Sequence, residues 1–212
     1  MKRLAVLSFA LVSALCLAGE VELKISGSSG LRGTAKLVNK LQEDGSKYVR
    51  MEMEMRSTNG QIVNVLQESV YDKRGMPVRM IQNTSTVGGT TQKIVATFDL
   101  LSVKVKATEG SRTNDESLTM PAGTNPHAKY EFWFIRDKIA PGGTTSYSRF
   151  DLQTLQWERV EAVYRGTKQI TVGGKSVNAH LVEIGGAKAY VDDAGDPWRV
   201  EMEGVVLERT SK

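Results

Sequence analysis

The chain has 212 residues, a formal net charge of +4 and a single cysteine, Cys16. Two of the positive charges lie at the extreme N-terminus, at Lys2 and Arg3. The rest is therefore close to neutral, without the concentrated Lys/Arg surface typical of a nucleic-acid partner. One cysteine cannot form an intramolecular disulfide or supply a cysteine cluster for zinc, and we expect no metal and no cofactor.

The first eighteen residues have the pattern of a secretory signal peptide. Two basic residues are followed by an apolar run over 4–15, and small residues lie near Ala18. The run is shorter than the roughly 20 apolar residues of a transmembrane helix, so no stable membrane span is expected. We predict cleavage near Ala18 and a periplasmic or secreted protein.

Cys16 lies inside this signal peptide and is expected to be discarded with it. A lipid anchor at Cys16 is not predicted, because a lipoprotein signal places a small residue before the cysteine and Leu15 is large. The remaining residues 19–212 are long enough for one well-packed domain, and we expect a single β-rich unit.

Most of this domain has the alternation of β-strands. Residues 49–56 and 101–107 alternate apolar and charged side chains with period two, which predicts strands with one buried and one solvated face. Further strands are expected at 21–26, 33–38, 62–71, 78–84, 93–99, 146–150, 155–164, 168–172, 176–184, 188–191, 198–203 and 205–209. Gly173-Gly174 predicts a tight hairpin turn, because adjacent glycines accept positive φ. Short turns throughout favour an antiparallel sheet or half-barrel.

One turn motif occurs twice. Residues 72–79 and 192–199 share the frame Asp-x-x-Gly-x-Pro-x-Arg, in which Asp bonds nearby backbone amides and Gly takes the left-handed position. The repeat has two interpretations. It is one turn used twice, or it is the trace of a duplication that made two similar halves, about 20–110 and 125–212.

A single helix is predicted over 126–139. Asn125 suits the N-cap and Pro126 the first helical position, and an apolar stripe ends before the Pro-Gly-Gly sequence at 141–143. The alternative is a strand through the aromatic residues at 131–135. The polar stretch at 110–123 is expected to be a loop.

The second half resembles a group of uncharacterised bacterial exported proteins in a series of short motifs. The matching segments are 125–126, 136, 141–142, 149–151, 164–166, 172–174, 179–183 and 190–195. That group is similar in fold to the lipoprotein carriers LolA and LolB, in which a curved antiparallel sheet wraps a helix around an apolar cavity. The resemblance implies a mainly β fold of this kind. It implies no site residue.

The sequence contains no motif of a known catalytic site. Only two histidines are present, His127 and His180, and they are far apart in the chain. His180 is expected to face solvent with Asn178 and Val182. Acidic residues such as Glu201 and Glu203 are expected to lie on the solvent-exposed face of a strand. We therefore predict that the protein is not an enzyme.

Methionine and aromatic residues suggest a site for an apolar ligand. Methionine is flexible and polarisable and suits adaptable apolar pockets. The predicted lining residues are Met51, Met53, Met55, Phe132, Ile135, Trp157 and Trp198. We expect an exported cell-envelope protein that binds a lipid or an acyl chain. The alternative is a structural or adaptor domain with a filled core, which binds another envelope protein and no small ligand.

Overall fold

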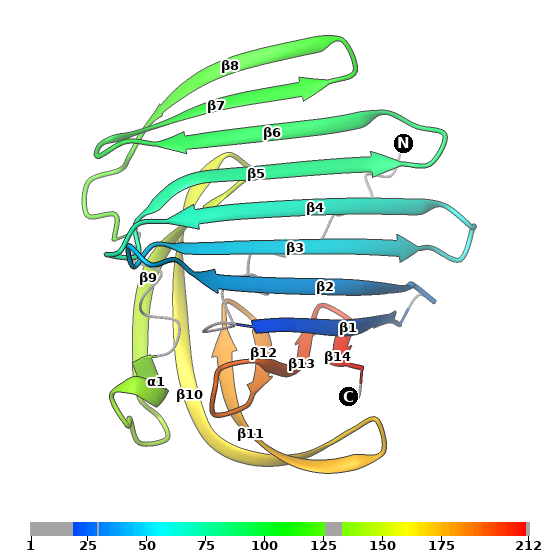
Figure 1. The fold of residues 1–212 in the computed structure, drawn as a ribbon, viewed down its shortest axis with the longest axis vertical. Helices are drawn as coiled ribbons and strands as arrows, with labels where there is room; N and C mark the ends of the chain where they lie inside the picture. The colour runs from blue at the N-terminus through cyan, green and yellow to red at the C-terminus, as the bar shows by residue number, and fades with distance from the viewer. Residues whose placement is uncertain (1–18, 29, 126–132, 211–212) are drawn as a thin grey trace.

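The computed structural model describes residues 19–28, 30–125 and 133–210 (Figure 1). Within them the fold is almost entirely β, with one helical turn. The elements are β1 (Gly19–Gly27), β2 (Arg32–Leu41), β3 (Lys47–Arg56), β4 (Ile62–Tyr71), β5 (Pro77–Thr86), β6 (Thr91–Phe98), β7 (Ser102–Glu109), β8 (Arg112–Thr119), α1 (Trp133–Arg136), β9 (Thr144–Asp151), β10 (Gln156–Val172), β11 (Lys175–Ile184), β12 (Ala187–Val191), β13 (Pro197–Met202) and β14 (Val205–Arg209).

All these strands belong to one antiparallel sheet in the order β8-β7-β6-β5-β4-β3-β2-β1-β14-β13-β12-β11-β10-β9. The first and last strands are neighbours in its middle, with Leu23 opposite Arg209. The sheet curls strongly, so that β9 and the first half of β10 run across the direction of β3 to β7 in Figure 1. Its edges, β8 and β9, are not paired with each other. The predicted curved antiparallel sheet is confirmed.

The concave face of the sheet carries the core. Leu23, Leu37 and Met51 lie in successive strands with almost no exposed surface, and their side chains meet those of β10 to β14 in one large cluster. Burying apolar surface in this way contributes roughly 25 cal/mol per Å². The period-two alternation places charged residues on the opposite, convex face.

A second, smaller cluster forms where the β9–β10 hairpin packs on β5 to β7. Its centre is a group of three aromatic side chains. The Phe98 ring lies 5.5 Å from that of Phe150 and 5.8 Å from that of Trp157, both edge to face. Such pairs contribute about 0.5–1.5 kcal/mol beyond their buried area. This contact holds the curl of the sheet.

β10 is one long strand where the sequence predicted two. The register against β11 shifts between Tyr164 and Thr167, and Gly166 has a φ of 84° at the bulge. A side chain at Gly166 would place its Cβ 2.9 Å from the ring of Pro141. The bulge bends the strand while the ladder continues, which the pattern of side chains alone does not show.

The turns behave as predicted. Gly173 and Gly174 have φ values of 55° and 78° between β10 and β11. The two copies of the Asp motif have the same geometry: the Gly75 amide donates to the Asp72 carbonyl, and Gly195 does the same with Asp192. The same backbone pattern closes the β1–β2, β2–β3 and β3–β4 loops, whose sequences lack the motif. One turn used repeatedly is therefore enough to explain the repeat.

The loop predicted over 110–123 and the helix predicted over 126–139 also require correction. The first segment contains β8, an edge strand in which every side chain except that of Leu118 is polar and exposed. It pairs with β7 through its backbone, and it escaped detection because it has no apolar alternation. The helix predicted over 126–139 ends at Arg136, and within the described residues it is the single turn α1; residues 126–132 lie outside them.

The early end of α1 has a local cause. Lys138 has a φ of 50°, its amide donates to the Ile135 carbonyl, and the Ile139 amide donates to the Phe134 carbonyl. This is the Schellman arrangement that terminates helices. Phe134 is buried in the main cluster, with Ile135 and Ile139 packed against it. The expected sheet wrapping one long helix is thus not seen in the described residues.

Candidate functional site

Most of the predicted ligand-binding residues lie in the main core cluster. Met51, Met53 and Met55 are 0%, 4% and 6% exposed, and Ile135 packs against the same cluster. Phe132 lies outside the described residues. The methionine side chains are therefore packed among other core residues in this structure.

Trp157 lies elsewhere. It belongs to the second cluster, against Phe98 and Phe150, and its ring centroid is 5.4 Å from that of Phe150. Its indole nitrogen is buried and has no hydrogen-bond partner among the residues that the structure describes. The structure therefore does not bring Trp157 together with the methionines.

Two of the predicted residues border pockets. Met53 lines one of about 630 Å³ whose wall consists mainly of polar and charged residues of β1 to β4. Trp198 borders the other, which has the more apolar lining. The pocket has a volume of about 610 Å³, within the usual range of small-ligand sites. It lies between the start of β1, the start of β13, the end of β14 and the tip of the β10–β11 hairpin. Its wall consists of Glu20, Val21, Glu22, Val172, Lys175, Val177, Asp196, Trp198, Arg209 and Thr210.

The pocket lies beside the end of the β1–β14 pairing. The β1–β14 register runs from Gly27 to Leu23, and the Thr210 amide donates to the Glu22 carbonyl just beyond it. The first residues of β1 extend past this point. The β10–β11 hairpin approaches β14 from the other side, where the Gly173 amide lies 3.4 Å from Glu208 Oε1. The hairpin thus contributes Val172 and Val177 to the wall.

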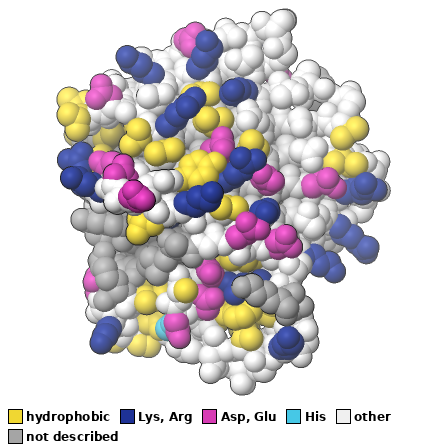
Figure 2. Space-filling view, in the orientation of Figure 1, with side chains coloured by type: hydrophobic (Ala, Val, Ile, Leu, Met, Phe, Trp, Pro, Cys, Tyr) yellow, Lys and Arg dark blue, Asp and Glu magenta, His cyan; other side chains and the backbone are white. Residues whose placement is uncertain are grey.

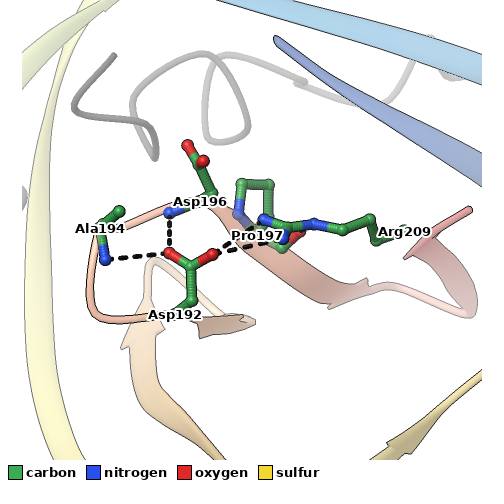
Figure 3. A network of polar contacts seen from close by, with 5 residues as sticks. All are labelled: Asp192, Ala194, Asp196, Pro197 and Arg209. Carbon is green, nitrogen blue, oxygen red and sulfur yellow. Dashed lines mark hydrogen bonds and ion pairs between the residues drawn. The ribbon is translucent and has the colours of Figure 1, made fainter. Parts of the chain in front are cut away.

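A polar network fixes the floor of this site (Figure 3). Asp192 Oδ1 accepts hydrogen bonds from the amides of Ala194 and Asp196 at 3.0 and 2.8 Å. Its other oxygen accepts from both terminal nitrogens of Arg209 at 3.2 Å, and Arg209 Nε donates to the Pro197 carbonyl at 2.9 Å. Charge-assisted bonds of this kind are the stronger ones in proteins. The network holds the β12–β13 loop against β14.

Arg209 also positions the aromatic wall of the pocket. Its guanidinium carbon lies 4.1 Å from the centre of the Trp198 ring, a stacked cation–π arrangement. The guanidinium is occupied by Asp192 and Pro197, so its role is to hold the loop and the indole. Lys175 at the hairpin tip is exposed and supplies a second cation at the rim.

The convex face of β1 to β4 carries charges of both signs, visible in Figure 2. Glu20 lies 2.6 Å from Lys36, and its hydrogen bond raises the pKa of Lys36. Arg50 pairs with Glu52 and with Glu68. Exposed pairs contribute little stability. This face therefore carries paired charges of both signs.

The prediction that His180 faces solvent is wrong. It does share a face with Val182, but that face is the concave one. Its Nδ1 lies 2.9 Å from the Tyr164 hydroxyl and its Nε2 lies 2.9 Å from Asp193 Oδ1. The Tyr164 ring stacks on Phe134 with centroids 4.8 Å apart. His180 therefore links the exposed β12–β13 loop to the core beneath α1.

The sequence had not indicated the hairpin-tip residues Val172, Lys175 and Val177, or Arg209, as wall residues. The signal available was the Gly173-Gly174 turn between apolar residues, but its distance from β1 and β14 depends on the bulge at Gly166. Among the described residues, no group of three or more His, Cys, Asp or Glu side chains is placed to hold a metal ion. Within the same part of the chain, no helix is long and apolar enough to cross a membrane.

No protein-family model matches this sequence, and no curated protein matches it. The chain is similar in structure to a β-barrel-like protein of the domain of unknown function DUF1849 from Brucella abortus. The TM-score is 0.59 at 13% sequence identity, over 90% of this chain and 94% of that one. At this identity the likeness concerns the fold alone. The similarity supports the predicted resemblance to an uncharacterised family with a β fold. It does not show the more specific similarity to LolA and LolB.

Proposed function

We propose that this protein is an exported, non-catalytic binding protein that holds an apolar ligand, such as a lipid or an acyl chain, in the pocket beside Trp198. The observation that carries the proposal is the pocket itself, about 610 Å³ beside the end of the β1–β14 pairing. The predicted signal peptide supports a role in the cell envelope.

The wall chemistry favours a ligand with an apolar chain and an acidic end. Val21, Val172, Val177 and the Trp198 indole offer apolar surface, and the Lys175 ammonium stands at the rim. Ligand sites commonly combine a mostly apolar wall with a few placed polar groups. The three carboxylates of the wall, those of Glu20, Glu22 and Asp196, disfavour a ligand with several negative charges.

The proposed site beside Trp198 is not the cavity between sheet and helix that the resemblance to LolA and LolB implied. The methionine face under α1 is filled by its own side chains, so an open space at the end of β14 takes its place. The proposal shares with LolA and LolB only the binding of an apolar ligand. It does not include the transport of lipoproteins.

The test begins with native mass spectrometry of the mature protein, purified gently from its own export pathway and followed by solvent extraction. An extractable added mass is expected. Oleate, added to ligand-depleted protein, is then titrated by following tryptophan fluorescence. Val177→Asp is expected to weaken oleate binding at least about tenfold, which corresponds to 1.4 kcal/mol.

The matched control is Val87→Asp, because Val87 is an exposed valine in the β5–β6 loop, away from the pocket wall. It is expected to leave oleate binding unchanged. Equal affinities of the wild type and Val177→Asp, with both proteins folded by circular dichroism, would contradict the proposal.

A second candidate function is an adaptor domain that binds another envelope protein. It is favoured by the β6–β7 turn, where Leu100 and Leu101 are 72% and 76% exposed. Adjacent leucines with so much exposed surface are a common feature of contact sites. Replacing both by serine is expected to abolish a specific crosslink in the envelope, and a crosslink that survives the double variant would remove this candidate.

A further inference from the structure

The start of β1 lies beside a carboxylate of the pocket wall. A Cβ built on Gly19 would lie 3.3 Å from Asp196 Oδ2 and 3.6 Å from Oδ1. Standard bond lengths and angles place the backbone nitrogen about 2.5 Å from such a Cβ. The nitrogen of Gly19 is therefore within about 6 Å of the Asp196 carboxylate, a distance at which opposite charges interact appreciably.

A buried amide lies at the same place. Asn39 is directly opposite Gly19 in the β1–β2 register, and directly opposite residues have Cβ positions about 4.5–5.5 Å apart. Asn39 is 3% exposed, and both atoms of its amide are buried without a hydrogen-bond partner among the described residues. Buried polar groups are nearly always satisfied in a native protein, so this amide requires an explanation.

The backbone of Asp196 is held in place by its loop. The Asp196 amide donates to Asp192 Oδ1, Asp192 in turn accepts from Arg209, and the Asp196 side chain points away from this network in Figure 3. The backbone at Asp196 is thus fixed within the β12–β13 loop. A cation at the nitrogen of Gly19 would lie beside the carboxylate of a residue whose backbone is held in this way.

Cleavage of the signal peptide creates such a cation. Hydrolysis of the Ala18–Gly19 peptide bond adds one water, leaving a carboxylate on Ala18 and an α-amino group on Gly19. The latter has an ordinary pKa near 8 and is largely protonated at neutral pH. We propose that this new α-ammonium group is bound by Asp196 and by the side-chain oxygen of Asn39, so that processing anchors β1 to the β12–β13 loop.

The anchor would complete the pocket, since Glu20 and Asp196 both line it. The unprocessed chain has an uncharged peptide nitrogen at this position and cannot form the ion pair. A protein of this design acquires the final form of its binding site after export. The inference rests on the export part of the proposed function and holds for any ligand.

The first measurement is the N-terminal residue of the exported protein, by mass spectrometry. Gly19 is expected, and any other first residue would overturn the proposal. Ligand binding is assayed separately, so a failure of this inference is distinguishable from a failure of the apolar-ligand proposal.

The second measurement compares purified chains that begin at Gly19 with chains that keep Ala18, which moves the charge by up to about 3.5 Å. Asp196→Asn is expected to lower the Tm of the Gly19 chain by about 3 °C or more and that of the Ala18 chain by less than about 1 °C. Glu20→Gln is the control, because Glu20 pairs with Lys36; its effect is expected to be equal in the two chains.

Two further measurements keep the inference testable if Asp196→Asn does not fold. Asn39→Leu is expected to raise the Tm of the Ala18 chain, where the amide is unsatisfied, and to lower that of the Gly19 chain. The α-amine of the Gly19 chain is expected to react with cyanate at least about threefold more slowly than that of the Ala18 chain. Equal effects of Asp196→Asn or Asn39→Leu in the two chains, or equal cyanate rates, would show that the amine is not bound.

Discussion

The guanidinium group of Arg209 covers the Trp198 ring at 4.1 Å while bonding Asp192. The equivalent aspartate of the first copy of the motif, Asp72, pairs instead with Arg74 in its own loop, at 3.1 Å. The Arg209 side chain is 16% exposed and that of Arg74 is 65% exposed. The aspartate of the turn therefore pairs with a largely buried arginine of a neighbouring strand at one position and with an exposed arginine of its own loop at the other.

This difference predicts unequal costs for removing the two arginines. Arg209→Ala leaves Asp192 Oδ2 and the Pro197 carbonyl without their donor and is expected to lower the free energy of unfolding by roughly 2–3 kcal/mol. Arg74→Ala is expected to cost less than about 1 kcal/mol, because exposed pairs contribute little. Urea denaturation of both variants measures the difference, and similar losses would contradict it.

Asp72 predicts a stability change in acid. Burial raises the pKa of Asp72, but the hydrogen bonds from the Met76 amide and from Arg74 outweigh it and leave the pKa lowered. A lowered pKa stabilises the fold above the unfolded value of about 3.9, and this contribution is lost as the pH falls through the folded pKa. Asp72→Asn is expected to cost about 1 kcal/mol at pH 7.

The check is the free energy of unfolding of the wild type and Asp72→Asn at pH 7 and at pH 2.5. The gap between the two proteins is expected to narrow at the lower pH, because acid shifts the wild-type carboxyl toward its protonated form. A gap that stays constant across this range would show that the charge of Asp72 is not the stabilising feature.

Met51 predicts the cost of a cavity in the core. Its side chain has no exposed surface at the centre of the concave face, and Met51→Ala is expected to lower the free energy of unfolding by roughly 2–5 kcal/mol. Met76 in the β4–β5 loop is partly exposed and serves as the comparison. A loss in Met51→Ala as small as that in Met76→Ala would mean that the concave face is open enough to relax around the missing side chain.

Lys175 predicts how the pocket treats an acidic ligand. Reversing its charge with Lys175→Glu is expected to weaken oleate binding about tenfold and to leave the affinity for a neutral long-chain alcohol nearly unchanged, because only the acid has a charge to pair. Lys168→Glu is the control, since Lys168 is exposed on the same hairpin and does not line the pocket. Fluorescence titration compares the two ligands, and equal losses for both would remove the proposed ion pair.

Local pattern was sufficient to predict most of the fold. The alternation around Met51 and Met53 placed one strand, and adjacent glycines at 173–174 placed a hairpin, because both signals lie within a few residues of the structure they specify. β8 has a single apolar residue, Leu118, which packs against the second cluster, so the strand lacks the apolar alternation that would have identified it. The end of the helix at Arg136 depends on a left-handed Lys138, a residue with no evident preference for that conformation.

The candidate site was harder to predict because its wall is assembled from distant segments. Trp198 was identified from its aromatic character and its place in a strand. Val177 and Lys175 belong to a hairpin whose long first strand, β10, is bulged at Gly166, and they line the same pocket as the end of β14. Neither the bend nor the relative length of two strands is encoded in a local motif. Other residues that were predicted to bind the ligand from their side-chain type, such as Met55, are instead part of the core.

The pairing of β1 with β14 affects how the chain folds during synthesis and how it could be circularly permuted. The strand order is that of a continuous meander cut open in its middle and rejoined between β8 and β9. During synthesis, therefore, β1 has no neighbour on one side until the last strand emerges, and the long-range pairing that joins the two ends closes the largest loop in the molecule. A circular permutant beginning at β9 and ending at β8, with the old ends joined by a short linker, would follow the whole sheet from one edge to the other through neighbouring strands alone.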